Sequence, residues 1–158
     1  MFTIEHRRSG KSYKVVITLA EDHELKQLRK DRYWFDWNKE KDFQVCKLLL
    51  CGKPEILGLM SLDYYHKESR IQIRLLAVSR ENKGKTGMYR RIAGNLIAYA
   101  CSKALYKYGV TACVSLIPKT GLRSHYMREY GFKSAGMSLF LEGPILKELI
   151  KRYKHEKE

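Results

Sequence analysis

Residues 71–96 read IQIRLLAVSRENKGKTGMYRRIAGNL, and this stretch decides the fold. Polar and apolar side chains alternate at its start, which predicts a β-strand over residues 70–78. A basic loop punctuated by Gly84 and Gly87 follows, and apolar residues at helical spacing then predict a long amphipathic helix over residues 88–108. A strand, a loop and a helix in this order direct backbone N–H groups and a helix N-terminus toward an anion.

The charge around this loop points to the same kind of ligand. One acid, Glu81, accompanies seven cations, which are Arg70, Arg74, Arg80, Lys83, Lys85, Arg90 and Arg91. A ligand with several phosphates is therefore the first hypothesis. A solvated basic loop is the alternative, and charge alone leaves it open.

Length and composition predict one folded domain over residues 1–158. The chain is 44% hydrophobic and 30% charged, as in ordinary globular proteins. No apolar run reaches the length of a membrane span and the first residues do not form a signal peptide, so we expect a cytoplasmic protein that does not insert into a membrane. The cysteines lack CxxC spacing, and we expect small buried thiols rather than a zinc site or disulfides at Cys46, Cys51, Cys101 and Cys113.

The net charge is the compositional outlier. Lysine and arginine number 31 against 17 acids, which gives a formal charge of +14. Such an excess favours a polyanionic partner: a phosphorylated cofactor, RNA, DNA or an acidic membrane surface. Charge alone does not choose among these.

The rest of the chain supplies strands and helices on both sides of this stretch. The predicted elements outside residues 70–108 are hairpins at 2–19 and 45–65, a helix at 20–30, a buried strand at 110–117, a helix at 121–130, a strand at 137–141 and a terminal helix from Pro144. The order ββαβββαβαβα predicts an α/β fold, a mixed sheet with helices packed on it and a helix at the C-terminus. In the long helix, Arg91 and Asn95 are expected to lie away from the apolar ridges.

Two motifs in this order resemble the general-control-related N-acetyltransferase (GNAT) superfamily, over residues 56–141, about half the chain. In that family a strand ending in Leu-Ala-Val precedes a basic loop of the form Gln/Arg-x-x-Gly-x-Gly/Ala. Here residues 76–78 read LAV, and Lys83 falls on the Gln/Arg position. Thr86 and Met88 fall on the two small-residue positions, which departs from the family's pattern.

The second motif lies within residues 120–132. The family has a helix ending in Tyr-x-x-Leu-Gly-Phe, and here the stretch closes on Gly131 and Phe132. Tyr126 lies one residue further from the glycine than the family's tyrosine, and an ungapped alignment would place Met127 there. The chain also ends in a helix where the family usually has a strand.

The resemblance implies acetyl-CoA as co-substrate and direct transfer of its acetyl group to an amine within a ternary complex. It places the pantetheine on backbone groups at the strand end, and the phosphates on the basic loop and the helix start. The implied cofactor-binding residues are Leu76, Ala77, Val78, Lys83, Gly84, Lys85, Thr86, Gly87, Met88 and Arg91. Tyr126 is the implied catalytic residue, because a tyrosine beside the sulfur can donate the proton that the departing thiolate needs.

The acceptor stays open between a small amine, a protein amine and the amino acid carried by a tRNA, which the positive charge favours. Tyr33, Trp37 and Tyr64 are the aromatic residues expected to bind it, whereas Trp34 is expected in the core. A non-catalytic nucleic-acid or partner-binding module on the same scaffold is the alternative from a different functional class. A monomer and a homodimer both agree with the sequence.

Overall fold

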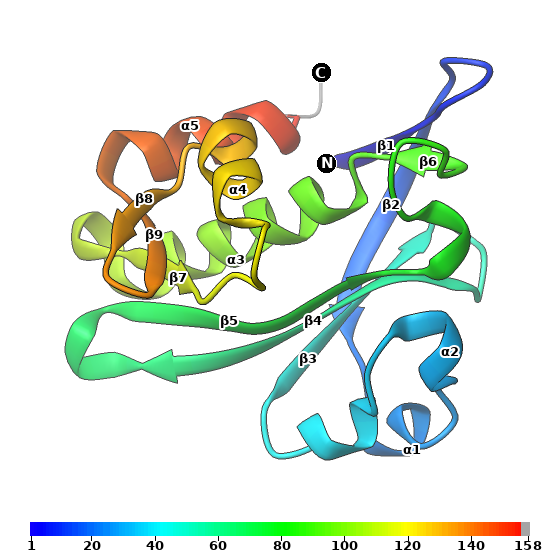
Figure 1. Ribbon diagram of the computed structural model, residues 1–158, viewed down its shortest axis with the longest axis horizontal. Coiled ribbons are helices and arrows are strands. Elements are labelled where there is room, and N and C mark those ends of the chain that lie inside the picture. The colour runs from blue at the N-terminus through cyan, green and yellow to red at the C-terminus, as the bar shows by residue number, and fades with distance from the viewer. Residues whose placement is uncertain (156–158) are drawn as a thin grey trace.

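One twisted sheet of nine strands organises the computed structural model, which describes residues 1–155 (Figure 1). The strand order is β6-β1-β2-β3-β4-β5-β7-β9-β8, and neighbouring strands are antiparallel except for the parallel pair β5 and β7. The strands are β1 (Phe2–His6), β2 (Ser12–Leu19), β3 (Gln44–Leu50), β4 (Ile56–Tyr65), β5 (Arg70–Val78), β6 (Tyr89–Arg90), β7 (Cys113–Leu116), β8 (Lys133–Ala135) and β9 (Ser138–Glu142). A parallel pair requires a crossover connection, and the helix α3 provides it.

Helices cover both faces of this sheet. α3, α4 and α5 lie on one face, and α1 and α2 lie on the other (Figure 1). The helices are α1 (Asp22–Leu25), α2 (Lys30–Tyr33), α3 (Ile92–Tyr108), α4 (Arg123–Tyr130) and α5 (Gly143–Tyr153), with 3-10 turns η1 (Trp37–Glu40), η2 (His66–Glu68), η3 (Arg80–Asn82) and η4 (Gly109–Thr111). Two hydrophobic clusters fill the interfaces. The larger one, here the α3 cluster, includes residues of α3 and α5, and the smaller one, the α1–α2 cluster, lies on the opposite face.

The mixed sheet with packed helices that the sequence predicts is confirmed. Both hairpins and the strand at residues 70–78 form as expected. Pro144 stands in the first turn of α5, where its missing N–H costs no helical hydrogen bond. Gly131 ends α4 in the left-handed conformation, with a φ of 82°, which glycine adopts without strain.

Four local predictions are wrong. The buried strand expected at residues 110–117 is confined to Cys113–Leu116, because Gly109–Thr111 form the turn η4. The helix expected at residues 20–30 is replaced by two short helices, α1 and α2, which do not form one continuous element. The long helix expected from Met88 begins at Ile92, because Tyr89–Arg90 form strand β6 and pair with β1. Asn95, expected on the solvated side of this helix, is fully buried, and its Nδ2 donates a hydrogen bond of 2.7 Å to a β1 carbonyl.

The four thiols are free and differ in exposure. Cys46 and Cys101 are buried as expected, Cys113 is partly buried and Cys51 is exposed. Among residues 1–155, no group of three His, Cys, Asp or Glu side chains is placed to hold a metal ion. No helix in the same part of the chain is both long enough and apolar enough to span a bilayer.

The C-terminal helix packs tightly on the first turn of α3. Tyr153 stands so close to Gly94 that a Cβ on the glycine would lie 2.2 Å from the ring. Arg91 Nη2 donates a hydrogen bond of 2.9 Å to the Arg152 carbonyl, and the guanidinium carbon lies 4.5 Å from the Tyr153 ring centroid. Packing, a hydrogen bond and a cation–π contact therefore fix α5 to the start of α3.

We expect Gly94→Ala to lower the free energy of unfolding by about 1–3 kcal/mol, because the added methyl group overlaps the Tyr153 ring. The direction of the change in unfolding free energy is diagnostic, since Gly→Ala in a helix otherwise stabilises a protein by about 1 kcal/mol. Urea unfolding measures the effect of Gly94→Ala in wild type and in a Tyr153→Ala variant. Without the Tyr153 ring, Gly94→Ala should raise the free energy of unfolding. Equal destabilisation in both backgrounds would contradict the contact.

Candidate active site

Two neighbouring parallel strands part in the middle of the sheet. β5 and β7 form four residue pairs, the last being Ile73↔Leu116, where β7 ends, whereas β5 continues to Val78. Within residues 1–155, the second half of β5 therefore has a strand neighbour only on its β4 side. We name this gap, beside residues 74–78, the strand opening. The Val78 carbonyl accepts a hydrogen bond from the Trp34 indole, and the other backbone groups on this free edge are available to a ligand.

A β-bulge lies where the strand opening begins. Leu62 pairs with Ile73 and Ser61 pairs with Leu75, so Arg74 has no partner on β4. The extra residue reverses the side-chain alternation, because Ile73 packs in the α3 cluster whereas Leu75 packs against the α1–α2 cluster. The regular alternation that the sequence predicts for this strand is therefore wrong beyond Ile73. Bulges occur frequently beside active sites, where they re-aim a strand.

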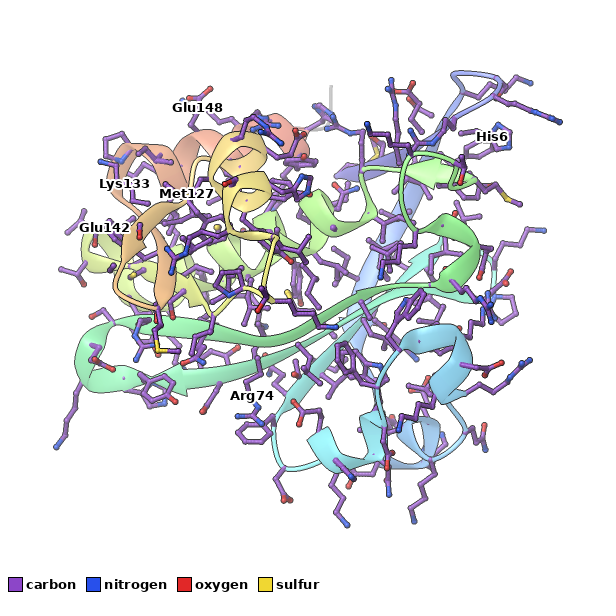
Figure 2. The ribbon with its side chains drawn as sticks, viewed as in Figure 1. His6, Arg74, Met127, Lys133, Glu142 and Glu148 are labelled. Carbon is purple, nitrogen blue, oxygen red and sulfur yellow. The ribbon has the colours of Figure 1, made fainter. Side chains whose placement is uncertain are left out.

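A buried carboxylate holds the Arg74 side chain on the α1–α2 face of the sheet (Figure 2). Arg74 Nε donates a hydrogen bond of 3.1 Å to Glu40 Oε1, and Ser61 Oγ donates one of 2.8 Å to the same oxygen. The guanidinium carbon also lies 3.7 Å from the Phe43 ring centroid. Sequence reasoning missed Glu40, because it lies in the charged run 38–42, NKEKD, which is typical of a solvated surface.

The basic loop after β5 satisfies some of its own backbone groups. The N–H groups of Lys83, Gly87 and Met88 donate hydrogen bonds of 3.3, 3.2 and 3.1 Å to carbonyls of the same loop. The side chain of Asn82 accepts a hydrogen bond of 2.9 Å from the Tyr89 N–H. Three of the six amides predicted to cradle a phosphate are therefore already bonded, and the cradle stays a prediction for the amides of Gly84, Lys85 and Thr86.

The structure divides the predicted cofactor residues among three places. One group lies on the free half of β5 and consists of Leu76, Ala77 and Val78. A second group lies in the loop, where Gly87 is buried and the exposed members are Lys83, Gly84, Lys85, Thr86 and Met88. Arg91 lies apart from both groups, since its side chain is engaged by α5. The loop thus presents exposed side-chain charge at Lys83 and Lys85, and only some of its amides are bonded within the loop.

Tyr126 faces inward from α4. Its ring packs against the α3 cluster, with centroids 6.0 Å from Tyr130 and 5.9 Å from Phe132. Met127, one helical position on, is 38% exposed (Figure 2). Burial raises the pKa of the Tyr126 hydroxyl, and this hydroxyl makes no hydrogen bond to another residue of the described chain.

The aromatic residues expected to bind an acceptor do not gather in one place. Trp37 is fully buried and Tyr33 nearly so; Trp37 Nε1 donates to the Tyr33 carbonyl, and Tyr33 Oη donates to the Ile56 carbonyl, both at 2.9 Å. These two are core residues, so their assignment to the acceptor is wrong. Tyr64 lies on the opposite face, against the α3 cluster, where burial raises its pKa to about 12. Trp34, expected in the core, is 37% exposed.

Solved structures share this arrangement of strands and helices. A crystal structure of a bacterial toxin gives a TM-score of 0.62 at 12% identity and covers 92% of this chain and 99% of its own. PaiA N-acetyltransferase from Thermoplasma acidophilum, in complex with coenzyme A, gives a TM-score of 0.56 at 13% identity, with 80% and 96% of the two chains covered. The chain has the GNAT acetyltransferase fold. No family model and no curated protein matches the sequence.

A third structure with the GNAT fold is a mutant of the toxin AtaT, bound to the C-terminus of the antitoxin AtaR and to acetyl-CoA. It gives a TM-score of 0.58 at 15% identity and covers 86% of this chain and 97% of its own. The GNAT fold that the two sequence motifs predict is thus confirmed, although the identities are low.

Three kinds of chemical group lie around one region of the fold: a free strand edge, exposed ammonium groups and a phenol. α4, which carries Tyr126, and the segment leading into it lie beside the free half of β5, on the α3 side of the sheet (Figure 1). The free strand edge can pair with amide groups, the loop after β5 carries exposed ammonium groups, and the Tyr126 phenol carries a proton. This region is the candidate active site.

Proposed function

We propose that this chain is an acetyl-CoA-dependent N-acetyltransferase that transfers acetyl directly to an amine in a ternary complex, without a covalent enzyme intermediate. The observation that carries the proposal is the strand opening. After the bulge at Arg74, β5 stays paired with β4 but has no strand neighbour on its β7 side within residues 1–155. Two structures with the same fold were solved with acetyl-CoA or coenzyme A. That co-substrate supplies an activated acetyl group when bound.

The residues present fit this co-substrate at two places. The pantetheine arm carries amide groups, which can pair with Leu76, Ala77 and Val78 as an added strand would. The phosphates suit the exposed ammonium groups of Lys83 and Lys85. Because the amides of Lys83, Gly87 and Met88 are bonded within the loop, side-chain charge would supply much of the phosphate binding here.

Two groups would act on the reacting atoms. Backbone N–H groups on the free edge of β5 are suited to stabilise negative charge on the thioester oxygen. Tyr126 Oη is our proposed proton donor to the departing sulfur, because its raised pKa keeps the hydroxyl protonated at neutral pH. The amine has to arrive unprotonated, since an ammonium group has no lone pair with which to attack. The nitrogen loses one proton to solvent water as the amide forms, and the Tyr126 phenolate regains a proton from solvent after the thiol leaves.

We expect isothermal titration with acetyl-CoA to show saturable one-to-one binding, which the double variant Lys83→Gln/Lys85→Gln weakens by about 10-fold through lost charge-assisted contacts. The matched control is Lys147→Gln/Lys151→Gln, which removes the same charge from exposed positions on α5. That control should bind acetyl-CoA within about twofold of wild type. No binding by wild type at millimolar acetyl-CoA would overturn the proposed function.

Among acceptors, the amine of an amino acid carried by a tRNA is our second and finer proposal. AtaT was also solved in complex with acetyl-methionyl-tRNAfMet, and that structure gives a TM-score of 0.54 at 14% identity, covering 87% of this chain and all of its own. The net charge of +14 favours an RNA partner. Incubation with aminoacylated tRNA and acetyl-labelled acetyl-CoA tests the idea. Label that stays off the RNA, while acetyl-CoA still binds, leaves a small or protein amine as acceptor.

A further inference from the structure

Trp34 is an exposed aromatic residue tied to the end of β5. It caps α2 in the left-handed conformation, with a φ of 74°, and this turns the indole outward. Its Nε1 donates a hydrogen bond of 2.8 Å to the Val78 carbonyl, the last residue of the strand. A large apolar ring is therefore held at the surface, next to the strand that borders the candidate active site.

Two lysines lie over aromatic rings at this position. Lys83 Nζ is 4.0 Å from the Trp34 ring centroid, and Lys119 Nζ is 4.4 Å from the ring centroid of the next residue, Phe35. Lys83 follows β5 and Lys119 follows β7, the two strands that part. We name Trp34 and Phe35 the aromatic platform, which both loops at the strand opening contact.

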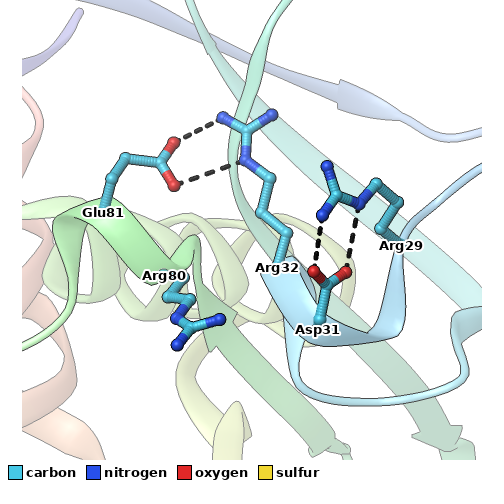
Figure 3. Close-up of a pocket in the computed structure, with 5 residues that line it drawn as sticks. All are labelled: Arg29, Asp31, Arg32, Arg80 and Glu81. Atoms are coloured by element: carbon cyan, nitrogen blue, oxygen red, sulfur yellow. Dashed lines mark hydrogen bonds and ion pairs between the residues drawn. The ribbon is translucent and has the colours of Figure 1, made fainter.

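A pocket of about 370 Å³ lies between η3 and α2, the helix that Trp34 caps, and it is lined by an arginine that forms no ion pair in the described chain. It is lined by Arg29, Asp31, Arg32, Arg80 and Glu81 (Figure 3). Arg29 is paired with Asp31 and Arg32 with Glu81, whereas Arg80 forms no ion pair with any residue of the described chain. Arg80 follows Val78 by two residues and precedes Lys83 by three, so it belongs to the segment that contacts Trp34.

We infer that the platform and this pocket bind the unpaired 3′ end of an RNA, with phosphates at Arg80 and Lys119. A base would stack on the Trp34 ring where Lys83 now lies, once Lys83 turns to the acetyl-CoA phosphates. Every base has an aromatic face that can stack on an indole, and neighbouring cations neutralise the phosphates between stacked bases. The inference rests on the proposed function and deepens it, because an amine carried on the 3′ end of an RNA would be delivered to the strand opening.

Two features argue for an unpaired RNA end over the alternatives. Inside a duplex each base is covered by a neighbour on both faces, whereas an unpaired base offers its face to a surface ring. The nucleotide part of acetyl-CoA is expected at Lys83 and Lys85, whereas Arg29, Asp31 and Arg32 of the pocket come from α2 and the residue before it, on the opposite face of the sheet from α3. The platform thus suits the acceptor better than the co-substrate.

Tryptophan fluorescence gives a direct readout. The chain has two tryptophans, and Trp37 is fully buried, so quenching by an added base reports Trp34. A single-stranded RNA heptamer ending in adenosine should quench saturably, and the same heptamer in a blunt duplex should bind at least 10-fold more weakly. By anisotropy of the labelled heptamer, Trp34→Ala should weaken binding by about 10-fold or more, and Trp34→Phe by less because a phenyl ring still stacks.

Charge-removing variants separate the pocket from general charge. Arg80→Gln should weaken heptamer binding several-fold and lower the slope of log affinity against log salt by about one. Lys147→Gln is the control, because it removes the same charge from an exposed position on α5 outside the pocket, and it should stay within about twofold. Arg80→Gln also keeps the inference testable if Trp34→Ala fails to fold.

Equal heptamer affinity in wild type, Trp34→Ala and Trp34→Phe would overturn the inference, as would equal affinity for the single strand and the blunt duplex. Equal losses in Arg80→Gln and Lys147→Gln would also overturn it, since they would indicate net charge alone. Acetyl-CoA titration of the same preparations reports the proposed function separately. Heptamer binding can therefore fail while acetyl-CoA binding holds, and the two failures are distinguishable.

Discussion

Tyr126→Phe should bind acetyl-CoA as wild type does but turn over at least about 100-fold more slowly, the scale expected for loss of a general acid. The phenyl ring keeps the packing against Tyr130 and Phe132, so the substitution removes the proton and little else. Steady-state rates with an identified acceptor measure this. Tyr130→Phe, which removes a phenolic hydroxyl from a buried neighbour on the same helix, is the control and should stay within a few-fold of wild type.

The pH profile adds a second signature of this role. Burial raises the pKa of Tyr126 above its ordinary value near 10, so the hydroxyl holds its proton through the neutral range. Wild-type turnover should therefore persist below pH 10 and fall as the pH rises through the raised pKa. Tyr126→Phe should lack that alkaline fall. Wild-type turnover in a properly folded Tyr126→Phe would make Tyr126 a packing residue.

Gly87→Ala should weaken acetyl-CoA binding by about 10-fold or more while most of the fold persists. A Cβ at this position would lie 2.3 Å from the carbonyl oxygen and 2.5 Å from the carbonyl carbon of Asn82. Backbone atoms cannot move aside as a flexible side chain does, so the loop that carries Lys83 and Lys85 has to shift. A displacement of about 1 Å is enough to spoil charge-assisted contacts to phosphate.

The control for Gly87→Ala lies three residues away. Gly84 has a φ of 77°, and a Cβ at this position would meet no atom within 4 Å, so Gly84→Ala adds backbone strain without a clash. Acetyl-CoA titration of both variants, with far-UV circular dichroism as a fold check, compares the two effects. If Gly84→Ala lost as much affinity as Gly87→Ala, general loosening of the loop would explain the result instead of the clash at Asn82.

The sequence was sufficient where structure depends on local pattern. Alternation and β-branched runs predict both hairpins, and Pro144 and Gly131 mark the start of α5 and the end of α4 through backbone chemistry that any fold shares. The two motifs at residues 76–88 and 120–132 were enough to predict the GNAT fold. These features depend on neighbours within a few residues.

The sequence failed where distant segments decide the local conformation. β6 has only two residues, and it forms because β1 pairs with it. Helical spacing in the sequence does not reveal this pairing, so the predicted helix wrongly included Tyr89 and Arg90. The bulge at Arg74 depends on pairing with β4, and its ion pair comes from Glu40, 34 residues away. No local pattern separates buried Trp37 from exposed Trp34, since the difference depends on a left-handed residue at the end of a one-turn helix.

Amide hydrogens along β5 should exchange with solvent in two different patterns. Up to Ile73 a strand flanks each side, so successive N–H groups meet a partner whichever way they point. From Leu75 to Val78 only the N–H groups that point toward β4 are bonded to a strand. Slowly and rapidly exchanging amides should therefore alternate there. Acetyl-CoA bound along the free edge would slow exchange only at the rapidly exchanging amides. Protection of every second amide would therefore reveal acetyl-CoA bound along the free edge of β5. Mass spectrometry or NMR can measure this protection before any acceptor is known.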